Sequence, residues 1–174
     1  MGPSIREKHS ATRLFMGYAA LSLVPILALG LVLARSYGAA ANSRGLVQAQ
    51  SQAELFASTA IEPLLDGTDL RRGLSTSVRA SLRTLADATA ADGAIPRLRV
   101  RDVDGRVVFS GDGSGLNSTP EAEAVDAGRG EPAALLTHLN GDENDTGPLG
   151  QQAVEVYLPL HSKSHPNPVG VLEM

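Results

Sequence analysis

The sequence predicts an α+β fold that follows an apolar N-terminal segment. Three observations support this prediction. A long run of residues lacks any charge, two stretches repeat apolar residues at helical spacing, and several short stretches alternate apolar with polar residues. Helices followed by antiparallel strands are typical of the α+β class. With 174 residues, 43% of them hydrophobic and 20% charged, the chain has room for one folded domain and an anchor.

The uncharged run covers residues 14–34 and has an arginine at each end. As a helix it would be about 31 Å long, which matches a hydrocarbon core of about 30 Å. We therefore predict a transmembrane helix over residues 14–35, kinked near Pro25. A buried core helix is one alternative. A cleaved signal peptide, with its site near residues 39–41, is the stronger alternative, although signal h-regions are usually shorter.

The charges on the two sides of this segment predict its orientation. Arg6, Lys8 and Arg13 precede it with one acid, whereas the residues from 36 onward carry 11 basic and 18 acidic side chains. The positive-inside rule then places residues 1–13 in the cytoplasm as a tail and residues 36–174 outside it. The sequence thus predicts a single-pass protein of the cell membrane.

The overall composition excludes several classes of function. A net charge of −4 has the wrong sign for nucleic-acid binding. The absence of cysteine removes disulfides, thiolate metal sites and thiol nucleophiles. We expect no nucleic-acid partner, no metal and no cofactor.

A first helix is predicted beyond the membrane, over residues 36–66, as a juxtamembrane stalk. Its apolar side chains recur at spacings of three and four, which forms a seam on one face. The seam either packs on the domain of the same chain or joins two copies as a homodimer. It consists of Leu46, Ala49, Ala53, Phe56, Ala60 and Leu64.

A second helix is predicted after Asp66-Gly67, with Thr68 or Asp69 as its cap. Its apolar positions fall on one face, and it ends near residues 91–93. These apolar positions are Leu70, Leu74, Val78, Leu82 and Leu85.

The pattern changes to strands at Arg97. Leu98 and Val100 alternate with arginines, and Asp104-Gly105 is a two-residue turn signal, so we predict a β-hairpin. The remaining elements are a short helix over residues 120–128, strands over 134–139 and 154–160, a loop rich in His and Pro, and a strand from 169. That last strand would be cut short at Met174, so we expect a fragment with an unfinished sheet edge.

Five segments, taken in their order and spacing, resemble one family. They are EPLLDG (62–67), RLRVRDVDGRVVFSGDGSG (97–115), NDTGP (144–148), VEVYLPL (154–160) and VGVLEM (169–174). Together they look like the N-terminal sensor region of actinobacterial diguanylate cyclase/phosphodiesterase membrane proteins, the GGDEF–EAL enzymes. The resemblance implies a PAS-type, Cache/PDC-like sensor domain over residues 67–174, with a long helix packed on an antiparallel sheet. It also implies catalytic domains that this chain does not contain.

The function that this resemblance implies is that of a non-catalytic, membrane-anchored sensory input module of a cyclic di-GMP signalling enzyme. The sensor region of a histidine kinase or chemoreceptor, and a membrane-tethered envelope binding protein, are the alternatives, because one input fold serves several outputs. No nucleophile-elbow serine or phosphate-binding loop is legible, so we expect no enzyme activity from this chain.

Arg99, Arg101 and Tyr157 are the candidate ligand-binding residues, since both arginines project from one side of their strand. The planar guanidinium suits a carboxylate or phosphate, and an unknown small ligand is the expected partner. Exposed strand charge is the simpler alternative. GDEND at 141–145 is interpreted as a solvated loop, because it lacks the GGDEF and EF-hand patterns. His161 and His165 are not expected to bind metal, because prolines argue against a helix there.

Overall fold

The structure is a computed structural model, which describes residues 5–66, 68–141, 145, 148–163 and 165–174. The side chains of residues 5–14 and 38–41 stand outside this description. The chain divides into two compact units, Met1–Arg44 and Gly45–Met174. The predicted stalk therefore contributes to both units.

The first unit is helical and belongs to α1 (Ile5–Phe56). An 18-residue window of this helix has a mean hydropathy of 2.1, and none of that window is buried. The helix is thus long and apolar enough to cross a membrane. A core helix would be buried, so the structure contradicts that alternative, whereas a signal sequence has the same length and composition.

Within the second unit, the last residues of α1 are followed directly by a π-helical turn η1 (Ala57–Ile61) and by α2 (Glu62–Leu65). The predicted seam packs on the core of its own chain from Ala49 onward. The fully buried positions after Ala53 are Ala57, Ile61 and Leu65, which the predicted seam omits. A π-helical turn is wider than an α-helical one, so residues four apart stay on one face. The buried face therefore passes through Ala57, Ile61 and Leu65 in place of the predicted Phe56, Ala60 and Leu64.

The second predicted helix begins later than expected. Asp69 caps only a short 3₁₀ turn, η2 (Leu70–Arg72), which ends at Gly73 with φ of 85°. The helix itself is α3 (Thr76–Ala91), and the side chain of Ser75 accepts a hydrogen bond from the backbone of Val78 at its start. A glycine with positive φ stops the first turn, so a new cap has to start the helix.

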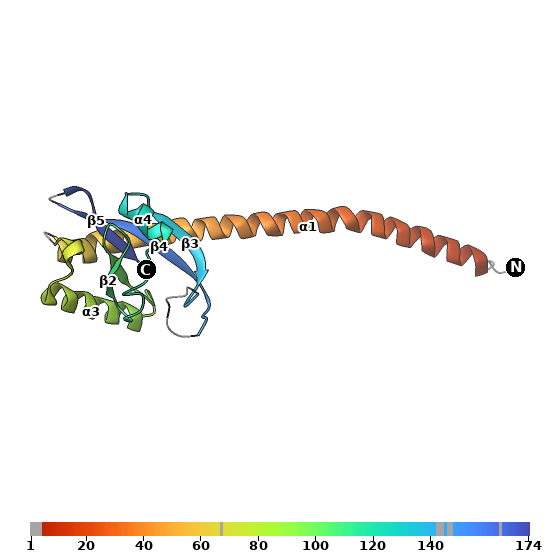
Figure 1. Ribbon diagram of the computed structural model, residues 1–174. Helices are drawn as coiled ribbons and strands as arrows, with labels where there is room; N and C mark the ends of the chain where they lie inside the picture. The colour runs from red at the N-terminus through yellow and green to blue at the C-terminus, as the bar shows by residue number, and fades with distance from the viewer. Residues whose placement is uncertain (1–4, 67, 142–144, 146–147, 164) are drawn as a thin grey trace. The chain divides into compact units, whose positions relative to one another are not determined.

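Among the described residues of the second unit, five antiparallel strands and one further helix follow, so the predicted α+β class is confirmed. The strand order is β2-β1-β5-β4-β3. Figure 1 shows α3 and α4 on opposite sides of these strands. The elements are β1 (Arg99–Arg101), β2 (Val107–Ser110), α4 (Ala122–Gly128), β3 (Ala133–His138), β4 (Gln152–Ser162) and β5 (His165–Glu173).

The last strand, β5, lies in the centre of the sheet and pairs with β1 on one side and β4 on the other. The expectation that it would leave an unfinished sheet edge is therefore wrong. The stretch rich in His and Pro, predicted as a loop, is largely strand: His161 and Ser162 end β4, and residues 165–168 begin β5. Pro166 and Pro168 fit there because the ladder between Leu160 and Ser162 is irregular, and proline is tolerated where the ladder is interrupted.

The β1–β2 hairpin is confirmed, but its turn is longer than predicted. The backbone N–H of Gly105 donates to the carbonyl of Asp102 at 3.0 Å, and Gly105 has φ of 84°. The N–H of Asp102 donates in turn to the carbonyl of Arg106. This is a three-residue loop with its glycine in the left-handed region, which also explains the register shift beside Arg101.

Candidate functional site

The candidate site lies on the face of the sheet that α4 covers. Because side chains alternate along a strand, Val100 and Leu172 point into the main core with α1 and α3. Their neighbours Arg99 and Glu173 point the other way. Glu173 is the partner of Arg99 on β1 and of Tyr157 on β4, so the register alone brings these three side chains together.

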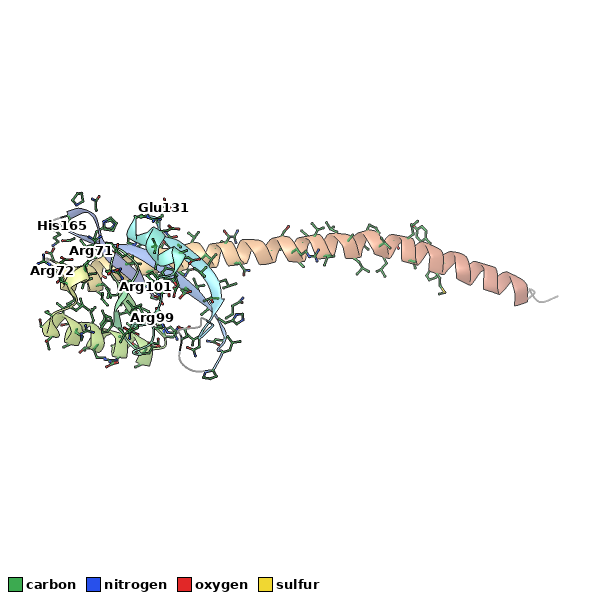
Figure 2. All side chains as sticks on the ribbon, viewed as in Figure 1. Arg71, Arg72, Arg99, Arg101, Glu131 and His165 are labelled. Carbon is green, nitrogen blue, oxygen red and sulfur yellow. The ribbon has the colours of Figure 1, made fainter. Side chains whose placement is uncertain are left out.

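Glu173 bridges the two arginines. Its Oε1 accepts from Nη1 of Arg99 at 2.7 Å, and its Oε2 accepts from Nε of Arg101 at 2.5 Å. All three residues are buried, with exposed fractions of 1% for Glu173, 1% for Arg99 and 0% for Arg101. The positive charges of Arg99 and Arg101, which Figure 2 labels, can both be buried here because the Glu173 carboxylate binds both of them.

Each arginine also has a carboxylate partner from outside the sheet. Nη2 of Arg99 is 2.8 Å from Oδ1 of Asp145, whose side chain is 2% exposed. Nη2 of Arg101 is 3.0 Å from Oε2 of Glu121, which immediately precedes α4. Glu121 is more accessible, with 24% of its side chain exposed, so it forms the solvent rim of the site.

Tyr157 completes the surroundings of Arg101. The Arg101 guanidinium lies 5.8 Å from the centre of the Tyr157 ring. The Tyr157 hydroxyl donates to the same Glu121 oxygen that Arg101 binds. Nη1 of Arg101 donates to the carbonyl of Gly105 at 3.0 Å, so the hairpin turn also holds this guanidinium.

A third arginine extends the network. Nη1 of Arg97 is 2.6 Å from Oδ2 of Asp145, so Asp145 is shared between Arg97 and Arg99. Nε of Arg97 donates to Asp112 at 3.1 Å. The hydroxyl of Ser114 donates to Asp112 at 2.6 Å and accepts from Nη2 of Arg99 at 2.5 Å. The loop after β2 thereby binds Arg97 through Asp112 and Arg99 through Ser114.

The charges reinforce one another. Burial alone would lower the pKa of Arg99, but the charge of Glu173 and the hydrogen bonds to Asp145 outweigh it and raise that pKa. The same balance of burial against Glu173 and Glu121 raises the pKa of Arg101. Both side chains are therefore charged at neutral pH.

The pKa values of two acidic partners, Asp145 and Asp112, shift in the opposite direction, downward. Burial acts to raise the pKa of Asp145, but hydrogen bonds from Arg97 and Arg99 outweigh it and lower that pKa. Burial is likewise outweighed at Asp112, where hydrogen bonds from Ser114 hold the pKa well below its usual range. Both carboxyls are ionised in the folded protein at neutral pH.

Burial, together with the negative charge of Glu173, raises the pKa of Tyr157. Its hydroxyl therefore stays protonated and remains a donor to Glu121.

Acid is expected to destabilise the fold through Asp112 and Asp145. A carboxyl with a lowered pKa stabilises the folded state fully above its unfolded pKa of about 3.9, and this is lost as the pH falls through the folded pKa. The urea midpoint of the full chain in detergent should fall as the pH drops below about 4. Asp145→Asn should show a shallower fall, and an unchanged acid dependence would contradict this assignment.

The structure brings Arg99, Arg101 and Tyr157 together, as the ligand hypothesis requires. Exposed strand charge, the simpler alternative, is wrong, because both arginines are buried. The interpretation of residues 141–145 as a solvated loop is wrong for Asp145, whose side chain is inside the network. Residues 142–144, as well as Thr146 and Gly147 of NDTGP, lie outside the described residues.

Three carboxylates of the network were not predicted from the sequence, namely Glu173, Asp145 and Glu121. A signal existed for Glu173, because the alternation through Val171 places it on the face opposite Leu172. No local pattern predicts the roles of Asp145 and Glu121, because each contacts an arginine that is distant in the sequence.

The network leaves little free volume. A cavity of about 50 Å³ borders it, lined in part by Arg97, Asp145, Glu155 and Glu173. That is room for a few water molecules. A larger groove of about 470 Å³ lies elsewhere, lined among others by Arg71, His165 and Asn167. Within the part of the chain that the structure describes, no group of three or more potential ligands is placed to hold a metal ion.

No family profile and no curated protein matches the chain. Among solved structures, the crystal structure of the Escherichia coli DcuS sensor domain is similar at a TM-score of 0.42 and 18% sequence identity. The match covers 69% of this chain and 86% of that one.

Proposed function

We propose that the chain is a membrane-anchored sensory input module that binds a small anion through Arg99, Arg101 and Tyr157. The observation that carries this proposal is that Arg99 and Arg101 are both buried on the face of the sheet that α4 covers. Buried ion networks stabilise a fold weakly compared with apolar packing, so a network of this size suggests a role beyond stability. The apolar helix in the same chain supports a membrane location.

The proposed ligand chemistry follows from the donors. Arg99 and Arg101 supply guanidinium N–H groups from neighbouring positions on one strand face, and Tyr157 supplies a hydroxyl. Such planar, forked donors suit carboxylate or phosphate oxygens. The described side chains around them include no serine–histidine or cysteine–histidine pair, so binding without catalysis is the simpler role.

The proposed output is a cyclic di-GMP enzyme, on the strength of the five segments that resemble actinobacterial GGDEF–EAL proteins. A Cache/PDC-like sensor would pass a ligand-induced change along its helices to the membrane. An in-frame membrane span followed by GGDEF and EAL motifs downstream of codon 174 is expected. A histidine kinase core there would favour the alternative output instead.

The proposed membrane orientation can be tested because the chain contains no cysteine. In intact cells, a membrane-impermeant maleimide is expected to label the full-length Glu131→Cys variant, since Glu131 is exposed on the second unit (Figure 2). The matched Lys8→Cys variant should be labelled only after the cells are permeabilised. Labelling of Glu131→Cys only after permeabilisation would overturn the extracytoplasmic placement of residues 36–174.

The same cysteine series tests a homodimer through residues 36–66, which belongs to the proposal. The seam packs on its own chain from Ala49 onward, so the contact would have to use exposed side chains such as Val47 and Leu55. Oxidation of Leu55→Cys should then give a cross-linked dimer. A monomer after oxidation would contradict this contact.

A further inference from the structure

The anion site proposed above is already occupied by the protein's own carboxylates. Glu121 contacts both Arg101 and Tyr157 through one oxygen, and Asp145 contacts Arg99. These are the contacts that a carboxylate ligand would make with the same donors. An incoming anion therefore has to replace an internal one.

The partners of the two arginines differ in how firmly they are held. Glu173 belongs to the central strand and binds both guanidiniums, so its removal would leave two buried charges without their shared partner. Glu121 is outside the sheet and partly open to solvent. It can leave Arg101 at a smaller cost, because its own charge can be hydrated at the surface.

Asp145 has an alternative partner built in. One of its oxygens is bound to Arg99 and the other to Arg97, at 2.8 and 2.6 Å. If Asp145 left Arg99, its charge would stay paired with Arg97, which itself also binds Asp112. The exchange of Asp145 for an external carboxylate would therefore leave no unpaired internal charge.

One donor of the pair is free to receive a ligand. Nε of Arg99 is buried and has no acceptor among the described residues. Buried donors are usually paired, so this N–H is available to donate to an oxygen of an external anion, which the internal carboxylates do not supply. It gives an external anion a contact beyond those that it would take from Asp145.

We propose that Glu121 and Asp145 are internal competitors that occupy the donors of Arg101 and Arg99, and that a compact carboxylate binds by displacing them. This inference rests on the proposed anion site. It adds that competition from Glu121 and Asp145 sets the affinity of that site for an external carboxylate. Glu121 and Asp145 then act as specificity-determining residues, because they exclude any anion that cannot replace their negative charge and the oxygen that each places on its arginine.

Acetate is a suitable probe, since it presents the same group as the Glu121 side chain. The thermal midpoint of the full chain in detergent is measured against acetate at constant ionic strength, kept with sodium chloride. The Glu121→Ala variant removes the competing charge and leaves space for acetate, so it should bind acetate at least about tenfold more tightly than the unmodified chain. Glu121→Gln keeps the shape of the side chain without its charge. It should also bind acetate more tightly than the unmodified chain, and it serves as the test if Glu121→Ala impairs folding.

The matched control is Glu131→Ala, which removes an exposed glutamate outside the network and should leave the acetate response unchanged. The gain in Glu121→Ala should disappear in the double variant with Arg101→Gln. If the unmodified chain binds acetate as tightly as both Glu121 variants, the competitor role is overturned while the anion site stands. If none of these proteins binds acetate, the competitor role is overturned and so is the proposed anion site at Arg101.

Discussion

Replacing Glu173 by alanine is expected to lower the free energy of unfolding by about 3–5 kcal/mol, because two buried arginines lose the carboxylate that they share. The carboxylate binds Nη1 of Arg99 and Nε of Arg101, and both arginines are at most 1% exposed. Neither guanidinium can turn to water without opening the face that α4 covers. The change is measured by urea unfolding of the full chain in detergent, followed by circular dichroism.

Two variants control this experiment. Glu173→Gln keeps the shape and one hydrogen-bond acceptor but removes the charge, so it should lose a large part of the same stability. Glu131→Ala removes an exposed glutamate and should change the unfolding free energy by no more than about 0.5 kcal/mol. If Glu173→Ala loses less than about 1 kcal/mol, the bridge does not hold the site together.

Gly128→Ala is expected to destabilise the fold by about 1–3 kcal/mol, through overpacking. Gly128 ends α4 against the hairpin turn between β1 and β2. A Cβ at this position would overlap the carbonyl oxygen of Val103 and lie 3.0 Å from its carbonyl carbon. Both are backbone atoms of the turn that also holds Arg101, so α4 or the turn would have to move. The measurement is again the urea midpoint.

Gly45→Ala is the matched control for this substitution. Gly45 is a helical glycine of the same unit, and a Cβ there would meet nothing within 4 Å. Alanine should therefore stabilise the helix by about 0.5–1 kcal/mol, the opposite sign. Equal effects of the two substitutions would show that close packing of α4 on the turn is not what Gly128 provides.

Much of the fold could be predicted because it depends on local periodicity. The alternation around Val100 and the Asp104-Gly105 pair predicted the first hairpin, and the spacing of Leu70 to Leu85 predicted a helix. Its start could not be placed, because the choice between Asp69 and Ser75 as cap depends on Gly73 adopting a positive φ. The π-helical turn at Ala57–Ile61 was missed for a similar reason, since its sequence is compatible with an ordinary helix.

The candidate site was predictable only in part. Alternation placed Arg99 and Arg101 on one face, but the same pattern is typical of an exposed strand. Burial depends on distant residues: Glu173 is 74 positions from Arg99 and 72 from Arg101. Strand pairing, rather than local sequence, brings them together.

The central place of β5 has a consequence for the order in which the protein folds during synthesis. The β1–β2 and β3–β4 hairpins are both translated before β5, yet they meet in the sheet only through it. Until that strand leaves the ribosome, β1 and β4 each have an edge with unpaired backbone groups, and Arg99 lacks its partner Glu173. We therefore expect the sheet to close late, in one step that joins two preformed halves, and the nascent chain to need protection from aggregation until then.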